Sequence, residues 1–574
     1  MITSSIKAAS RRIVASVLGG CMATAPLSAQ PCAPTIDPDR SIVVHDPALL
    51  KEPFALRKVI AQLLRDLPVP ASGADAEAAL MASLVATFAK SEEVNPISNV
   101  VMKVDVRPGE NQLVASRLLD PDDEYGLVPV GLFNRLDLAP RNFRNCGEYR
   151  IVYAFKAPIS PPKVGKFDDR FFLIFEMKMP NPQFVGAAGC LGLADFWRDL
   201  SDIEDDAQRI EALRKFYFDG IPGYTPGPIH PHHLGALGQL RGNLFIEDKW
   251  QLREWKLLST DPGRFVMEPV KSNPLAELYV DAGKKADGLD PLRAEFHAAF
   301  VAHKGILEGL LEPELVFIPK AMMTDPRLNP HSPAFDRSHY EKVVVNRVGL
   351  PTPDGRFNEF QSDSQGTLDV PEENLGSDFR NDITFALQKL LTGFPLGASV
   401  TIDDVMARAG AATCGGCHQH ANEKPIGTVN TVTFNWPTTQ NNKGFVHITE
   451  TGQLSKTLTD SMIPFRRDTL AKFICDPPLD ETAGLGYLQE RFEAALADYN
   501  QTLTDYRLTR LNVITTLQRD ALTQGGPPAT AAELTDAERK VTARFEESLR
   551  QKMEAVGDAE RNLPGAFVEN RRPH

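Results

Sequence analysis

Residues 171–179 read FFLIFEMKM, a short apolar run of the kind that forms a buried β-strand. Similar short runs occupy residues 149–155, 244–246 and 250–258. The connections between them are rich in proline and glycine, which favours antiparallel pairing over repeated βαβ units. The pattern predicts a β-rich antiparallel body.

Helical patterns flank this body on both sides. Between residues 54 and 88, apolar side chains recur at steps of three and four, which predicts packing helices. The same spacing over residues 485–506 predicts a long amphipathic helix, and a second helix is predicted over about 531–556. The expected fold is therefore α+β, with flanking helices and a C-terminal helical hairpin.

Charged residues interrupt the apolar strand runs, where an isolated charge would be costly. They are Arg135, Asp137, Glu148, Arg150, Arg241, Arg253 and Glu254. We expect them to pair with one another in a buried ion-pair network that stabilises the β-rich body. The alternative is a site for a substrate carboxylate, or an acid/base pair.

The composition is that of a large globular protein, with 574 residues, 42% of them hydrophobic and 24% charged. A formal net charge of -13 argues against nucleic acid as a partner. The sequence has no glycine-rich phosphate loop, G-x-S-x-G elbow or H-E-x-x-H helix, so the common nucleotide and hydrolase chemistries lack support.

The N-terminus has the pattern of an export signal. Lys7, Arg11 and Arg12 form a basic region, a weakly apolar stretch follows over 13–27, and small residues lead to Ala29. We predict a signal peptide over residues 1–29. This places the mature protein in the periplasm, at the cell surface or outside the cell.

A lipid anchor is the alternative at this end of the chain. The string LGGC at residues 18–21 is similar to a lipobox, in which Cys21 would become the lipidated N-terminus. No later stretch has the length and apolarity of a transmembrane helix.

The run CGGCH at residues 414–418 has the C-x-x-C-H spacing that attaches a c-type haem. Cys414 and Cys417 would form thioether bonds to the porphyrin, and His418 would bind the iron. The two glycines between the cysteines let the loop close against a flat ring. The motif predicts one covalently bound haem c. A redox disulfide or half of a zinc site would be the competing interpretations.

A helix is expected immediately before this motif. Thr401 and Asp404 have the spacing of a capping box, and the apolar residues that follow lead toward Cys414. Such a helix would present the two cysteines at its end.

The second iron ligand has two candidates. Met462 would raise the reduction potential, and His447 lies in the apolar string GFVHI. An open position would instead permit ligand binding or peroxide chemistry. Without a ligand role, His447 would be a packed strand histidine and Met462 would fill the core.

Three clustered imidazoles, those of His230, His232 and His233, form a second constellation. Such groups can bind zinc, copper or iron. No carboxylate or cysteine lies at a fixed spacing from them, so a polar loop is the favoured interpretation over a metal site.

Four cysteines remain once Cys21 and the C-x-x-C pair are set aside. In an oxidising compartment we prefer a bridge between Cys146 and Cys190, because both flank the same β-rich segment. Cys32 and Cys475 would then pair by elimination. Free buried thiols are the alternative for all four.

Residues 413–418, with the preceding helix, resemble a c-type cytochrome, and MIPF at 462–465 is similar to the stretch that supplies the distal methionine in many of them. Three further strings resemble a largely uncharacterised family of secreted bacterial proteins, several of which carry a single C-x-x-C-H: NRLDLAP at 134–140, CGEYRIVY at 146–153, and GQLR at 238–241 leading to WQLRE at 250–254. This resemblance implies no firm activity. It argues against Met462 as a ligand, because related chains carry another apolar residue there.

The function expected is that of an exported monohaem c-type protein in electron transfer, with a large body that docks a redox partner protein or a small-molecule substrate. An enzymatic alternative is a haem-dependent oxidoreductase, such as an oxidase or peroxidase, and a haem sensor is another. A further alternative is a non-haem secreted binding or structural protein with a disulfide between Cys414 and Cys417.

Six segments are expected along the chain. They are the signal peptide (1–29), an N-terminal helical region (30–95), the β-rich body (96–275), a mixed region of helices and loops (276–395), a small helical c-type haem segment (396–475) and the C-terminal helical region (476–574).

Overall fold

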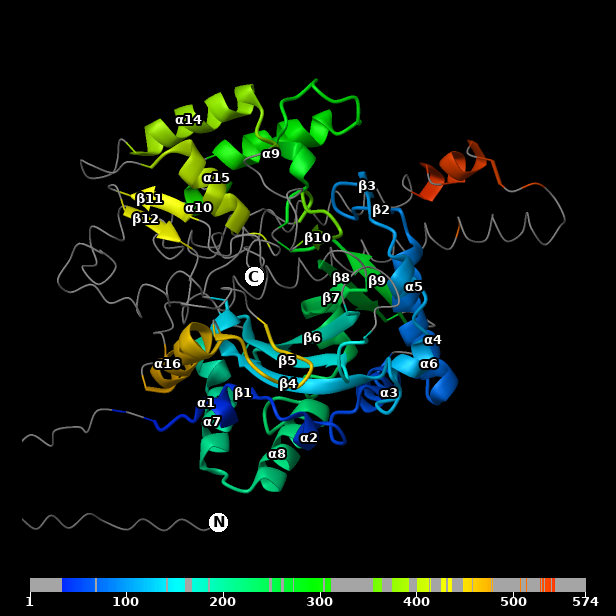
Figure 1. The fold of residues 1–574 in the computed structure, drawn as a ribbon, viewed down its shortest axis with the longest axis vertical. Coiled ribbons are helices and arrows are strands. Elements are labelled where there is room, and N and C mark those ends of the chain that lie inside the picture. Colours follow the sequence, from blue (N-terminus) through cyan, green and yellow to red (C-terminus); the bar gives the residue numbers. More distant parts are fainter. Residues whose placement is uncertain are drawn as a thin grey trace, which may run out of the picture. The chain divides into compact units, whose positions relative to one another are not determined.

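The computed structural model describes residues 34–310 with short gaps, together with several later stretches (Figure 1). These stretches are 355–363, 374–391, 400–411, 425–429, 432–435, 447–475 except 457, and isolated residues elsewhere, including parts of 529–541. Contacts divide the chain into Met1–Ala33 and Pro34–His574. The predicted signal peptide, Cys21 and the helix over 485–506, apart from Tyr506, lie outside the described residues.

One antiparallel sheet organises the second unit. Within the described part of the chain it has eight strands in the order β1-β4-β5-β6-β7-β8-β10, and β9 pairs with β8. Their bounds are β1 Val43–Val44, β4 Leu127–Arg135, β5 Asn145–Phe155, β6 Arg170–Pro180, β7 Gln239–Phe245, β8 Gln251–Leu258, β9 Arg264–Glu268 and β10 Ser362–Asp363. The α+β prediction with an antiparallel body is thus confirmed.

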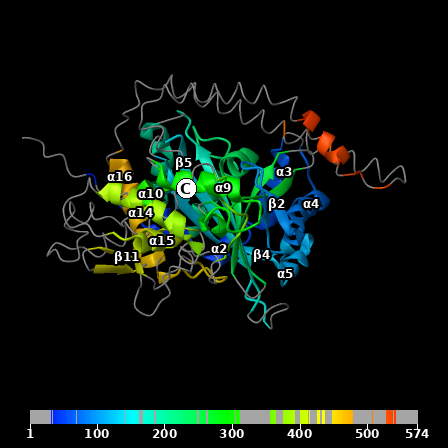
Figure 2. The ribbon, with the colours of Figure 1, turned by 90° about the horizontal axis from the view of Figure 1, so that it is seen from above.

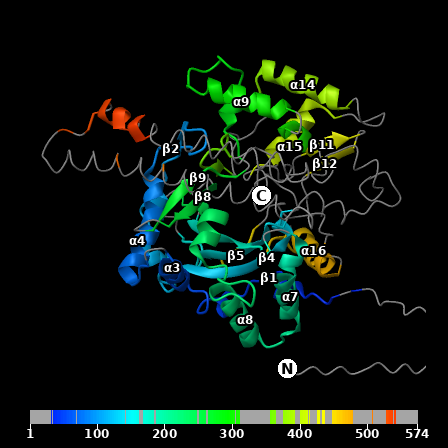
Figure 3. The same ribbon diagram turned by 180° about the vertical axis from the view of Figure 1, so that it is seen from behind.

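The sheet is apolar on one face. Because side chains alternate along a strand, Tyr149, Ile151 and Tyr153 of β5 share this face and are fully buried. The helices α7 (Leu191–Asp199) and α8 (Asp206–Phe218) pack here, where Trp197 stacks on Tyr149 at 5.8 Å between ring centroids. Figure 3 shows both helices beneath β4 and β5.

The N-terminal helices cover the same face at the other end of the sheet. α3 (Leu56–Arg65) and α4 (Ala74–Val85) bury the apolar positions that the spacing predicted, and α4 packs on β9. Just after α4, Thr87 accepts a 2.9 Å hydrogen bond from the indole Nε1 of the buried Trp255 in β8. The predicted packing helices of this region are confirmed.

A second group of helices follows the sheet in the chain. α9 (Asp290–Val301), α10 (Ile306–Leu310), α14 (Ser377–Leu391) and α15 (Ile402–Ala411) contact one another, and Figure 2 shows α14 beside α15 and α10. The predicted capping box begins α15, because the Thr401 amide donates to the Asp404 carboxylate at 2.8 Å and the Asp404 amide donates to Thr401 Oγ1. Every helix in the described ranges is too short or too polar to serve as a membrane span.

A disulfide joins Cys146 of β5 to Cys190, as predicted. Cys190 ends the short helix η3 (Ala187–Cys190) that leads into α7, so the bond ties the sheet to its helical cover. Cys32 and Cys475 each take part in a disulfide as well, which excludes the free-thiol alternative for these four cysteines. Disulfides persist in oxidising environments, and these bonds are consistent with an extracellular one.

The structure differs from expectation inside residues 96–275. α7 and α8 interrupt the strands there, whereas the pattern indicated only short strands. The edge strands β1 and β10 come from outside that range and are two residues long each. So short a strand carries no alternation that could be recognised in the sequence.

Candidate functional site

The opposite face of the sheet is charged. Cross-strand register places Arg150 opposite Glu176 and Arg241 opposite Glu254, and all four side chains lie on this face. The ion pairs include Arg150–Glu148 at 2.6 Å, Arg150–Glu176 at 3.0 Å, Arg241–Glu254 at 2.8 Å, Arg241–Glu176 at 3.4 Å and Arg135–Asp137 at 2.9 Å. The predicted ion-pair network therefore exists.

One predicted member lies elsewhere. Arg253 is on the apolar face, where its Nε donates to Gln251 Oε1 at 2.7 Å and another nitrogen donates to the Asp105 carbonyl. Burial, together with nearby Arg107, lowers the pKa of Arg253 to about 10. Adjacent residues on a strand point to opposite faces, so Arg253 and Glu254 could not both belong to one network.

Two carboxylates of the network, those of Asp137 and Glu148, have pKa values below their ordinary values although they are buried. Burial alone would raise the pKa of Asp137, but Arg135 and Arg466 outweigh burial and lower it below its ordinary value. In the same way Arg150, Lys178 and Lys271 lower the pKa of Glu148. Asp137 and Glu148 are thus fixed negative charges at neutral pH.

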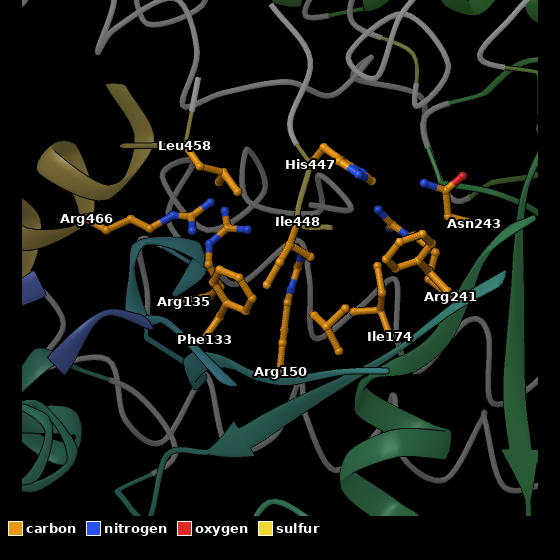
Figure 4. A pocket seen from close by; sticks show the side chains of 12 residues that line it. Phe133, Arg135, Arg150, Ile174, Arg241, Asn243, His447, Ile448, Leu458 and Arg466 are labelled. Carbon is orange, nitrogen blue, oxygen red and sulfur yellow. The ribbon is translucent and has the colours of Figure 1, made fainter. Parts of the chain in front are cut away.

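A pocket of about 100 Å³ opens above this network (Figure 4). It is lined by Phe133, Arg135, Arg150, Val152, Phe172, Ile174, Arg241, Asn243, His447, Ile448, Leu458 and Arg466. The lining residues come from β4, β5, β6 and β7, from the loop that carries His447 and Ile448, from Leu458, and from α16 (Ile463–Cys475). None of these lining residues is acidic, and four carry a guanidinium group.

Arg466 is the least satisfied of the four arginines. Its side chain is 5% exposed, and in Figure 4 it reaches from α16 toward Arg135. Its Nε lies 3.9 Å from Asp137 Oδ1 and has no hydrogen-bond partner within the described part of the chain. One terminal nitrogen donates to the Met462 sulfur at 3.7 Å. Burial, with Arg135 nearby, lowers the pKa of Arg466 well below its ordinary value.

His447 borders the other end of the pocket, beside Arg241 and Asn243 (Figure 4). Its ring lies edge-on to Phe172, with 5.4 Å between centroids. Burial, and to a lesser extent Arg170, lowers the pKa of His447 to about 4. The imidazole is therefore neutral at neutral pH.

Met462 ends a short π-helical turn, Leu458–Met462, just before α16. It is buried, and its sulfur accepts the hydrogen bond from Arg466. The structure therefore brings both candidates for the second iron ligand, His447 and Met462, to the charged side of the sheet. Of these two residues, only His447 lines the pocket. The attachment residues Cys414, Cys417 and His418 lie outside the described residues.

The three clustered histidines precede β7. His233 is buried, and its Nδ1 bonds the Gly227 carbonyl at 3.0 Å. Its ring centroid lies 5.1 Å from that of His230 and 6.1 Å from that of His232. No set of three or more histidine, cysteine, aspartate or glutamate side chains in the described ranges is arranged to hold a metal ion.

His233 makes stability depend on pH. Burial, together with His230, lowers its pKa to about 4, whereas the unfolded chain takes up the proton near pH 6.5. Stability is therefore lost as pH falls from 6.5 toward 4. At pH 5 we expect His233→Asn to recover roughly 2 kcal/mol of this loss, at about 1.4 kcal/mol per pH unit. Urea unfolding at pH 7 and pH 5 measures it, and equal pH losses in wild type and variant would contradict it.

The sequence pattern identified part of the pocket. Arg135, Arg150 and Arg241 were predicted as network members, because they interrupt apolar strands. Arg466 was missed, since nothing in the string FRRD distinguishes it from a surface arginine. Strand alternation could have shown that Glu148 and Arg150 share a face, but not that α16 lies over it.

Comparison with known proteins adds no assignment to this geometry. No family model, curated protein or solved structure matches the chain. The features of this chain that point to a function are therefore the C-x-x-C-H motif and the pocket.

Proposed function

We propose that this chain is an exported protein that carries one haem c and serves in electron transfer. The observation that carries the proposal is the run CGGCH at residues 414–418. Cys414 and Cys417 hold the porphyrin by thioether bonds, and His418 binds the iron. The haem supplies a one-electron centre whose potential depends on the second ligand, on burial and on hydrogen bonding.

The disulfides support this compartment. Haem c is attached outside the bacterial cytoplasm, in the environment in which the Cys146–Cys190 bond persists. The sequence of residues 1–29 provides an export signal. We place the mature protein in the periplasm or at the cell surface.

The helix before the motif supports attachment at a defined position. α15 buries Val405, Met406 and Ala409 and contacts α14 and α10. Just beyond its end, the Thr413 hydroxyl donates to the Gly410 carbonyl at 2.8 Å. α15 ends at Ala411, close to Cys414 in the sequence, and it is capped at its start and packed against α14 and α10.

His447 suits the second ligand position better than Met462. A histidine binds iron as a neutral imidazole, and burial lowers the pKa of His447 to about 4. The Met462 sulfur is buried and already bonded to Arg466. The structure thus favours the core-filling alternative for Met462.

A haem stain tests the proposal. The full chain with its own leader is expressed with a cytochrome c maturation system, and the mature protein is separated on a denaturing gel. We expect the stain to persist in the wild type and in His230→Ala, and to be lost completely in Cys414→Ala/Cys417→Ala. A colourless wild type would overturn the proposal in favour of the non-haem alternative.

Ligand variants refine the role. We expect a low-spin ferrous spectrum that carbon monoxide does not change, as electron transfer requires, and that Met462→Leu leaves intact. His447→Ala should open the position and make the spectrum sensitive to carbon monoxide. A wild type that already binds carbon monoxide would favour the oxidase, peroxidase or sensor alternative over electron transfer.

A further inference from the structure

We propose that the arginine-lined pocket binds a small organic anion, whose carboxylate is received by Arg466, Arg135 and Arg150. This inference goes beyond the haem proposal and does not depend on it. It rests on the charges, the burial and the lining of the pocket.

Within the described residues, Arg466 is a buried cation without a close anion of its own. A guanidinium that is 5% exposed needs a close anion, since burial of a lone charge is costly. Asp137 lies 3.9 Å away, and both of its oxygens already accept from Arg135. Asp137 therefore satisfies Arg135 and leaves the Arg466 Nε without a hydrogen bond. A bound carboxylate would complete this set of donors.

The other carboxylates below the pocket are shared in the same way. Glu148 contacts both Arg150 and Lys178, and Glu176 contacts both Arg150 and Arg241. Each of these two carboxylates thus serves two cations. Because no acidic residue is among the described residues that line the pocket, its four guanidinium groups give it a positive potential (Figure 4).

The rest of the lining defines the class of anion. The pocket lining also contains the apolar residues Phe133, Val152, Phe172, Ile174, Ile448 and Leu458. A free volume of about 100 Å³ is several times what one water molecule needs. The site therefore suits a carboxylate with a compact apolar body better than a fully hydrated inorganic ion.

A haem propionate presents the same carboxylate chemistry as a free anion. We assign the site to a free small-molecule carboxylate, and the experiment separates the two sources. The probe is benzoate, which joins a carboxylate to a flat apolar ring, and benzyl alcohol is its uncharged control. Inorganic phosphate tests the contribution of charge alone.

Calorimetry on the full mature protein measures binding. We expect benzoate to bind, benzyl alcohol and phosphate to bind at least tenfold more weakly, and Arg466→Met to lose at least tenfold in benzoate affinity. Arg466→Met removes a buried charge while Asp137 keeps Arg135, so it should melt at or above the wild-type temperature. Arg214→Met, on the exposed side of α8, is the matched control and should bind like wild type.

Ile448→Glu is a second variant that does not remove an arginine. It places a carboxylate in the pocket lining, where it should pair with the arginines and abolish benzoate binding. Absence of binding to the wild type and to its haem-free form, or equal binding to wild type and Arg466→Met, would overturn the proposal.

The haem-free variant Cys414→Ala/Cys417→Ala distinguishes the sources. Equal benzoate affinity with and without these cysteines supports a free anion. Binding that appears only in the variant shows that a propionate fills the pocket, and it overturns the assignment to a free anion. If the wild type carries no haem, it and the Cys414→Ala/Cys417→Ala variant should bind benzoate equally. The comparison of wild type with Arg466→Met then tests the proposal by itself.

Discussion

Replacement of Glu176 with alanine is expected to destabilise the protein by about 3–5 kcal/mol. Glu176 is 1% exposed and accepts a 2.6 Å hydrogen bond from Gln239. It also lies between Arg150 and Arg241, at 3.0 and 3.4 Å. Loss of this carboxylate leaves two partly buried guanidinium groups with less negative charge between them, on the central strands of the sheet.

Urea unfolding followed by far-UV circular dichroism at pH 7 measures this change. Glu211→Ala is the matched control, because Glu211 also pairs with an arginine but lies exposed on α8. An exposed pair of this kind contributes about 0–1 kcal/mol. If Glu176→Ala cost no more than the control, the charged network would not stabilise the sheet.

Removal of the disulfide is the second large effect. The Cys146–Cys190 bond closes a loop with a sequence separation of 44 residues. The chain-entropy relation for a loop of this length gives about 4 kcal/mol, which Cys146→Ala/Cys190→Ala should lose. Cys146 and Cys190 are both fully buried. We therefore expect the double variant to lose the cross-link between β5 and η3 without exposing new surface in the folded protein.

Denaturant midpoints of the wild type and the double variant, measured without reductant, check this prediction. Wild type unfolded in dithiothreitol should approach the variant, because the reductant reaches the sulfurs once the chain opens. A variant within 1 kcal/mol of the oxidised wild type would show that the unfolded chain gains little freedom when this loop is opened.

Local patterns predicted the elements that carry their own signal. The apolar runs over residues 149–155 and 171–179 lie within β5 and β6, because a buried strand needs apolar side chains along its length. The capping box at the start of α15 was also predictable, because its two residues, Thr401 and Asp404, are only three positions apart in the sequence. The Cys146–Cys190 bridge followed from its position beside one β segment.

Arrangements between distant segments were not predictable in this way. β1 and β10 are strands only because a neighbouring edge offers hydrogen bonds to two residues of each. Arg466 belongs to the pocket because α16 packs beside α7 and the turn after β4, near Asp137. Neither arrangement produces a periodic pattern of residues in β1, β10 or α16 that could be recognised in the sequence.

For this protein, the sequence alone predicted the strand runs with their antiparallel pairing, the capped helix and the Cys146–Cys190 pair, and it contains the C-x-x-C-H motif. The three-dimensional arrangement alone decided that three strand arginines, one helix arginine and His447 share a pocket whose described lining contains no carboxylate. Periodicity reports how a side chain is oriented within its own element. A binding site requires elements far apart in sequence to meet, and the packing of the whole core determines where they do.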